Sequence, residues 1–86
     1  MTKITVIGGG SSYTPELVEG LIAHYQDVPL TELALVDVES GREKVGIIAE
    51  LTKRMLKRNG LEQVVVSVHF ELEPAIRGAS FVLTQL

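Results

Sequence analysis

The chain has 86 residues, of which 45% are apolar and 22% are charged, and this balance is typical of a globular domain and excludes a disordered segment. Its formal net charge of −3 disfavours a nucleic-acid-binding module, which needs a basic face, and no apolar run approaches the length of a membrane span. The chain contains no cysteine, which excludes a disulfide framework and a thiolate zinc site within it.

The first element in chain order is a strand predicted over residues 3–7. Ile4, Val6 and Ile7 make this segment apolar and β-branched, and three consecutive glycines at 8–10 end it in a tight turn. The N-terminal residues pass directly into the strand, without the apolar stretch and small-residue cleavage site of a secretory signal. We therefore expect a cytoplasmic protein.

A helix is predicted next, over residues 15–25. Thr14 is placed to cap it, and Pro15 suits the first helical position, where a missing N–H costs nothing. Its buried stripe recurs at helical spacing and consists of Leu17, Val18, Leu21, Ile22 and Tyr25. A near-continuous apolar run within residues 32–38 then predicts a strand covered on both faces, which ends at Asp37.

A long helix is predicted over residues 41–58, with Asn59 and Gly60 as its stop signal. Four cations crowd its last turns, where positive charge complements the helix dipole: Lys53, Arg54, Lys57 and Arg58. We prefer this interpretation to a nucleic-acid patch because the whole chain is acidic. A strand over 64–70, a helical turn over 73–77 and a strand over 80–86 complete the pattern.

The regular alternation of strands and helices predicts an α/β fold. It indicates a Rossmann-like, doubly wound parallel sheet with right-handed crossovers and helices on both faces. The last strand is apolar and has no helix after it to cover it. We therefore expect residues 1–86 to be the N-terminal part of a larger domain in a longer polypeptide, with the fourth strand exposed.

The glycine turn has the chemistry of a pyrophosphate site. The first turn of a helix offers unpaired N–H groups and the positive end of a dipole, and glycine lets the backbone approach the phosphate. Gly8 and Gly10 are the first two glycines of the dinucleotide fingerprint, but Tyr13 stands where the third is expected. Ser11 and Ser12 add hydroxyls that can reach phosphate oxygens.

Asp37 follows the turn at the distance expected for the acid that binds the adenosine ribose. A carboxylate accepts hydrogen bonds from ribose hydroxyls and repels a 2′-phosphate, so NAD is favoured over NADP, although Arg42 lies near enough to weaken that preference. The alternative is a parallel sheet whose glycine turn binds a mononucleotide or nothing. His24 and His69 are interpreted as structural, because they belong to no common motif.

Residues 3–22, KITVIGGGSSYTPELVEGLI, resemble the N-terminus of glycoside hydrolase family 4, specifically its 6-phospho-β-glucosidases. The segments LVD at 35–37, KRM at 53–55 and ASFVLTQ at 79–85 fit the same pattern. The resemblance covers essentially the whole chain. It also accounts for Tyr13, because members of this family carry tyrosine at that position in place of the third glycine.

The resemblance implies an enzyme that hydrolyses 6-phospho-β-glucosides, phosphorylated disaccharides among them, with NAD and a divalent metal, usually Mn²⁺. This family departs from the two-carboxylate scheme of most glycosidases. Its reaction proceeds by oxidation at C3 of the sugar, loss of the C2 proton and elimination of the aglycone, and the hydride finally returns. The family's metal ligands, a Cys and a His, and its catalytic Tyr are expected beyond residue 86, so no catalytic or metal-binding residue is assigned here.

The resemblance places the cofactor half of the site in this chain. It implies that Gly8, Gly10, Ser11, Ser12 and Tyr13 lie near the pyrophosphate, Asp37 at the ribose, and Thr84 and Gln85 toward the nicotinamide. We expect no nucleic-acid or membrane partner, and a homo-oligomer for the full-length form. The alternatives are a 6-phospho-α-glucosidase or α-galactosidase of the same family, a 2-hydroxy-acid dehydrogenase, and a non-catalytic NAD-sensing module.

Overall fold

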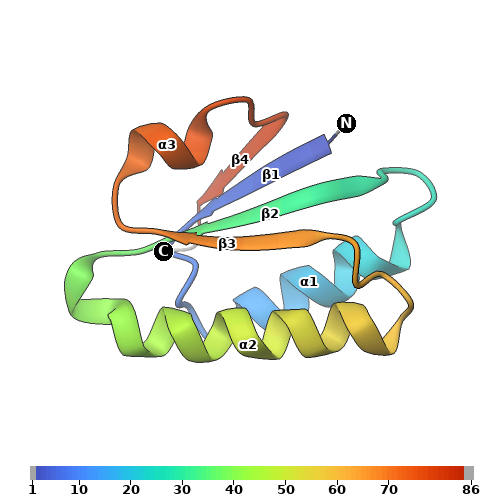
Figure 1. The fold of residues 1–86 in the computed structure, drawn as a ribbon, viewed down its shortest axis with the longest axis horizontal. Coiled ribbons are helices and arrows are strands. Elements are labelled where there is room, and N and C mark those ends of the chain that lie inside the picture. The colour runs from blue at the N-terminus through green and yellow to red at the C-terminus, as the bar shows by residue number, and fades with distance from the viewer. Residues whose placement is uncertain (1, 85–86) are drawn as a thin grey trace.

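The computed structural model describes residues 2–84, which form one parallel sheet with the strand order β3-β2-β1-β4 (Figure 1). The strands are β1 (Thr2–Ile7), β2 (Leu30–Val36), β3 (Val65–His69) and β4 (Phe81–Thr84). The α-helices are α1 (Thr14–Ala23), α2 (Arg42–Arg58) and α3 (Leu72–Ile76), and a short 3₁₀ helix, η1 (Glu39–Gly41), precedes α2. The predicted Rossmann-like doubly wound sheet is confirmed.

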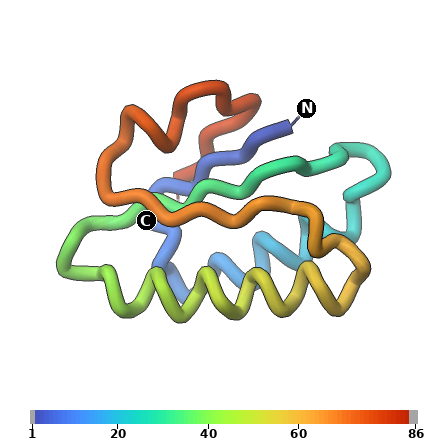
Figure 2. Tube along the Cα trace, in the orientation of Figure 1, coloured from blue at the N-terminus to red at the C-terminus, as the bar shows by residue number. Residues whose placement is uncertain are grey.

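Helices cover both faces of the sheet, as predicted. Helices α1 and α2 lie side by side below the sheet in Figure 1, and α3 lies above it. The tube in Figure 2 shows how each crossover returns the chain to the same end of the sheet, so that all strands run in one direction. The carboxyl ends of the strands therefore meet at one edge, which is where such folds bind ligands.

The core lies between the sheet and the α1–α2 layer. Val6, Leu33 and Leu35 are fully buried on the two central strands, and they pack against Val18 of α1 and Val45 of α2. Strand β2 is buried on its other face as well, where Ala34 has no exposed surface. The apolar run without alternation in this strand follows directly from that double cover.

Several element boundaries differ from the prediction by one or two residues. Helix α1 begins at Thr14, one residue earlier than predicted. The Thr14 hydroxyl lies within the first turn, where it donates to the Gly9 carbonyl at 3.0 Å. Tyr13 occupies the cap position without a side-chain cap bond, so the prediction that Thr14 caps the helix was wrong. The helix also ends earlier, at Ala23, and Tyr25 packs on the core from the following turn.

The predicted stop of the long helix is confirmed. Gly60 adopts a left-handed conformation with φ of 73°, which glycine reaches without steric cost. The N–H of Leu61 then donates to the Leu56 carbonyl at 2.8 Å, which satisfies one of the last helical carbonyls.

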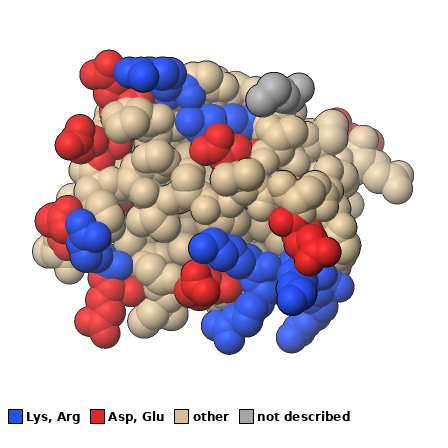
Figure 3. Space-filling model, viewed as in Figure 1, with Lys and Arg blue, Asp and Glu red and all other residues tan. Residues whose placement is uncertain are grey.

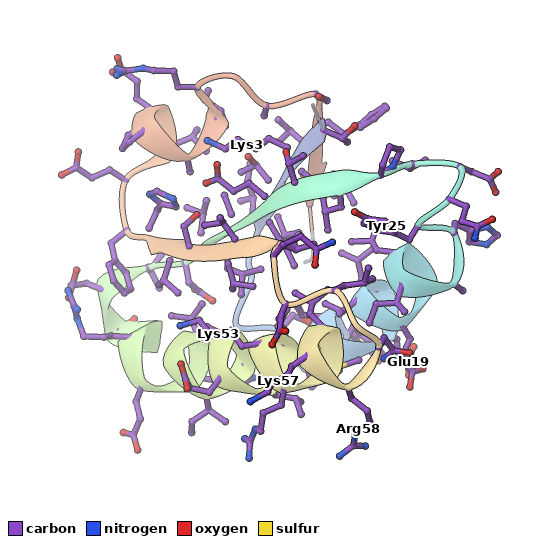
Figure 4. The ribbon with its side chains drawn as sticks, turned by 45° about the vertical axis from the view of Figure 1, so that its right-hand side comes forward. Lys3, Glu19, Tyr25, Lys53, Lys57 and Arg58 are labelled. Atoms are coloured by element: carbon purple, nitrogen blue, oxygen red, sulfur yellow. The ribbon has the colours of Figure 1, made fainter. Side chains whose placement is uncertain are left out.

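The cations are concentrated at one end of the longest helix. Cations gather over the C-terminal half of α2, at the lower right of the space-filling view (Figure 3). In Figure 4, Lys53, Lys57 and Arg58 project from α2 on one side of the sheet, whereas Lys3 lies on the side of α3. Lys3 donates to the Arg77 carbonyl at 2.8 Å, at the C-terminal end of α3, so it holds that short helix on the sheet.

Gly20 offers a test of the packing of α1. It lies in the middle of the helix and is exposed, and a Cβ built on it meets no atom of the described chain within 4 Å. We expect Gly20→Ala to raise the free energy of unfolding by about 0.5–1 kcal/mol, because alanine loses less backbone entropy in a helix. The thermal unfolding midpoint measures this change, and a lowered midpoint would contradict the free surface assigned to this position.

Candidate functional site

Three of the predicted site segments meet at the carboxyl edge of the sheet. Ile7, the last residue of β1, pairs in register with Val36 of β2 on one side and with Thr84 of β4 on the other. The glycine turn, Asp37 and Thr84 therefore follow three neighbouring strands at the same edge. Tertiary structure thus brings together residues that are up to 76 positions apart, from Gly8 to Thr84.

The glycine turn leaves β1 through a left-handed residue. Gly8 has a φ of 82°, a conformation that side-chain-bearing residues rarely adopt. The N–H groups of Gly8 and Gly9 both donate to the Val36 carbonyl at 2.8 Å, so the end of β2 anchors the start of the turn. Gly8 is therefore required by the backbone of the turn itself.

Gly9 and Gly10 are required by close packing inside the protein. A Cβ on Gly9 would lie 2.7 Å from the Cβ of Leu35, and a Cβ on Gly10 would lie 2.5 Å from Oδ2 of Asp37. Sequence reasoning attributed the glycines to the approach of a phosphate. The structure adds a reason that holds without any ligand, because these residues let the turn lie directly on β2.

Asp37 holds the turn in place through both of its carboxylate oxygens. Oδ2 accepts the Gly10 N–H at 2.8 Å, and Oδ1 accepts the N–H of Val38 at 2.8 Å. A carboxylate offers about four lone-pair positions, so these two bonds leave acceptor capacity on each oxygen. Gly41 in η1 packs against the same carboxylate, since a Cβ there would lie 3.1 Å from Oδ1.

The start of α1 presents donors at this edge. The N–H groups of Ser11 and Thr14 are used within the turn, by the carbonyls of Gly8 and Ser11, and the Tyr13 N–H donates to the Ser11 hydroxyl at 3.2 Å. Within residues 2–84, the N–H of Ser12 has no hydrogen-bond partner, and Ser12 is exposed. A backbone donor at a helix N-terminus is the group that binds a phosphate oxygen.

Tyr13 is placed outward at the position of the missing third glycine. Its side chain is 63% exposed, and its backbone is helical. The helix and strand still pack closely, because the buried Thr14 and Val18 supply the contact surface of α1. Thr84 is exposed at the end of β4, and Gln85 lies outside the described residues.

Two features of the site were missed by sequence reasoning. Gly9 was not assigned a role, although a Cβ on it would lie 2.7 Å from the Cβ of Leu35 in β2. The contact of Gly41 with Asp37 was also missed. In the sequence, both residues are glycines near the end of a strand. Such a glycine indicates close packing only when the order of the strands in the sheet is known.

The two histidine side chains make no contact with the glycine turn or with the carboxylate of Asp37, although the carbonyl of His69 accepts the Asp37 N–H at 3.1 Å. His24 is exposed after α1 beside Asp27, and the ring of His69 on β3 lies 3.0 Å from the hydroxyl of Ser67. Over residues 2–84 there is no group of three His, Cys, Asp or Glu side chains that could hold a metal ion. None of the helices in this described range has the length and apolar character needed to cross a membrane.

Comparison with known proteins identifies the relatives of the chain. The sequence model of the family 4 glycosyl hydrolases matches residues 3–86. A probable 6-phospho-β-glucosidase of Bacillus subtilis (strain 168) is 49% identical over 96% of this chain, and the 6-phospho-β-glucosidase of Escherichia coli (strain K12) is 46% identical over 98% of it.

A solved structure agrees with these relatives in fold. The 6-phospho-β-glucosidase of Thermotoga maritima, determined with manganese, NAD⁺ and glucose-6-phosphate, superposes with a TM-score of 0.86 at 38% identity over 99% of this chain. The chain spans about a fifth of these proteins: 19% and 18% of the two curated relatives, and 20% of the solved structure. The match of the family's sequence model to nearly every residue means that the chain belongs to glycosyl hydrolase family 4.

Proposed function

We propose that residues 1–86 are the NAD-binding segment of a metal-dependent 6-phospho-β-glucosidase. The observation that carries this proposal is the edge formed by the glycine turn, Asp37 and Thr84, which has the arrangement of a dinucleotide site. The curated relatives from Bacillus subtilis and Escherichia coli support the substrate class, since both are named as 6-phospho-β-glucosidases.

The residues at the edge fit the parts of NAD. The free N–H of Ser12, with the hydroxyls of Ser11 and Ser12, would donate to the pyrophosphate at the positive end of the α1 dipole. Gly8 and Gly10 let the turn lie close to the end of β2, which would leave room for the cofactor to lie across it. Tyr13, exposed beside these donors, would cover the pyrophosphate from the solvent side.

The two ends of the cofactor are assigned to different strands. Asp37 would accept the adenosine ribose hydroxyls through the lone pairs that its bonds to Gly10 and Val38 leave open. Thr84 ends β4, on the other side of β1, and this residue and the next in sequence, Gln85, would contact the nicotinamide half. Bound there, the nicotinamide would supply a reversible hydride acceptor for the sugar.

Metal ligands and acid–base groups would come from outside this segment. No cluster of potential metal ligands occurs in residues 2–84, and no side chain at the edge is placed as a general base. The proposed Mn²⁺ would polarise sugar oxygens as a Lewis acid. The relatives are about five times as long as this chain, which leaves room for such residues.

The test is turnover of an aryl 6-phospho-β-glucoside by the protein expressed from its complete gene. After dialysis against a chelator, hydrolysis should require both added NAD and Mn²⁺. No reduced nicotinamide should accumulate during turnover, because the hydride returns in each cycle. Hydrolysis in chelator without NAD would overturn the proposal.

The same assay separates the alternatives. Preference for the aryl 6-phospho-α-glucoside would assign the protein to the sister specificity within the family. Accumulation of reduced nicotinamide in step with product, using a 2-hydroxy acid, would indicate a dehydrogenase. NAD binding without turnover of any of these substrates would favour the non-catalytic NAD-sensing module.

A further inference from the structure

Arg42 is the cation nearest to Asp37 in the sequence, and its side chain is held from two sides. Its Nε donates to Oε1 of Glu39 at 2.6 Å, and its guanidinium carbon lies 4.2 Å from the centroid of the Phe70 ring. The hydrogen bond and the charge of Glu39 raise the pKa of Arg42 above its ordinary value. Arginine is charged at any physiological pH, and the contact with Phe70 directs this guanidinium to the end of β3.

The backbone before Arg42 lies against the carboxylate of Asp37. Gly41 makes this contact, as its missing Cβ would lie 3.1 Å from Oδ1. The side chain of Arg42 therefore starts close to the proposed ribose position. It extends toward β3 and not toward Asp37, because its partner Phe70 follows that strand. A hollow of about 420 Å³ surrounds it, lined by Glu39, Arg42, Val68, His69, Phe70, Glu71 and Pro74.

The charges around this hollow are unfavourable for a phosphate. Glu39 and Glu71 line it, and Asp37 follows the adjacent strand β2, so a phosphate bound in this region would meet the negative charge of three carboxylates. A ribose 2′-phosphate would need a free guanidinium, which binds phosphate oxygens in a bidentate manner. Arg42 has the right chemistry for that role, but its Nε bond to Glu39 and its contact with Phe70 direct its 64%-exposed side chain toward the end of β3.

We propose that Glu39 and Phe70 keep Arg42 away from the adenosine ribose, and that the Glu39–Arg42 pair thereby sets the preference for NAD over NADP. The inference rests on the proposed function, since it assigns a specificity determinant to the same cofactor site. Glu39 acts in two ways: it binds Arg42, the residue that follows η1, and it adds a negative charge that repels a 2′-phosphate. Asp37 alone then faces the ribose.

The test compares NAD and NADP binding by calorimetry in the protein expressed from its complete gene. Glu39→Gln removes the negative charge and weakens the bond that holds Arg42, so the ratio of the NADP Kd to the NAD Kd should fall about fivefold at low salt, with NAD affinity nearly unchanged. The effect should shrink at high salt, because the charges are exposed. Adding Arg42→Ala to Glu39→Gln should abolish the gain in NADP affinity.

The chain provides a matched control within α2. Glu50 pairs with Lys53 at 3.2 Å, with the same spacing of three residues and a similar exposure, but farther from the edge. Glu50→Gln should leave the ratio unchanged. An unchanged ratio of the NADP Kd to the NAD Kd in Glu39→Gln would overturn the inference. Normal NAD binding by that variant would still support the cofactor site. Absence of NAD binding by the unmodified protein would overturn the proposed function, and this inference with it.

Discussion

Replacing Gly9 with alanine is expected to lower the free energy of unfolding by about 2–3 kcal/mol. The added Cβ would lie 2.7 Å from the Cβ and 3.0 Å from the Cα of Leu35. Both atoms belong to Leu35, a fully buried residue next to the carboxyl end of β2, a strand that pairs with neighbours on both sides and cannot shift without breaking the sheet. The cost therefore comes from collision and not from backbone conformation, because Gly9 does not have a positive φ.

The thermal unfolding midpoint of the protein expressed from its complete gene measures this effect. Gly20→Ala is the matched control, because it adds the same methyl group at a helical position with free space and should raise the midpoint slightly. Gly9→Ala should also weaken NAD binding, since the turn would be lifted from β2. A midpoint equal to that of the unmodified protein would show that the turn does not lie on β2 as described.

Replacing Asp37 with alanine is expected to weaken NAD binding about 10- to 100-fold. Two contributions add in the same direction. The variant loses the carboxylate that would accept the ribose hydroxyls, and a hydrogen bond to a charged group contributes about 1.5–3 kcal/mol. It also leaves the N–H groups of Gly10 and Val38 without their acceptor, and Gly10 is buried.

Asp37→Asn distinguishes the two contributions. The asparagine oxygen can replace one backbone bond, whereas its amide cannot accept the other, so the affinity should lie between those of the alanine variant and the unmodified protein. Asp27→Ala is the control, as that carboxylate is 83% exposed after α1, at the opposite end of the sheet. Unchanged NAD affinity in a folded Asp37→Ala protein would remove Asp37 from the proposed site.

Most of the element order was predictable because this chain follows local rules closely. The triple glycine ends β1, Pro15 and the helical stripe mark α1, and Asn59 with Gly60 ends α2, each through chemistry confined to a few residues. The boundaries were less certain where a side chain could serve two purposes. Thr14 is a good cap residue in isolation, but the fold uses its hydroxyl to bind Gly9 inside the first turn.

The sequence predicted that the glycine turn, Asp37 and Thr84 lie at one edge of the sheet, but not the contacts between them. The spacing of Gly8, Gly10 and Asp37 indicated a dinucleotide site, because the strand–turn–helix–strand unit repeats that spacing wherever it binds a cofactor. The spacing could not indicate that Asp37 accepts the N–H of Gly10, a contact between residues 27 positions apart. Nor could it indicate that Arg42, close to Asp37 in sequence, turns to Phe70.

The sequence by itself determined the order and type of the elements, the glycine turn and the family of this protein. These properties depend on local conformational preference and on motifs whose residues lie close together in the chain. Only the tertiary structure decided that Gly9 and Gly10 are needed for packing on β2, that both oxygens of Asp37 hold the backbone, and that Glu39 and Phe70 engage Arg42. Such contacts depend on strand order and register, which bring distant residues together at one edge of the sheet.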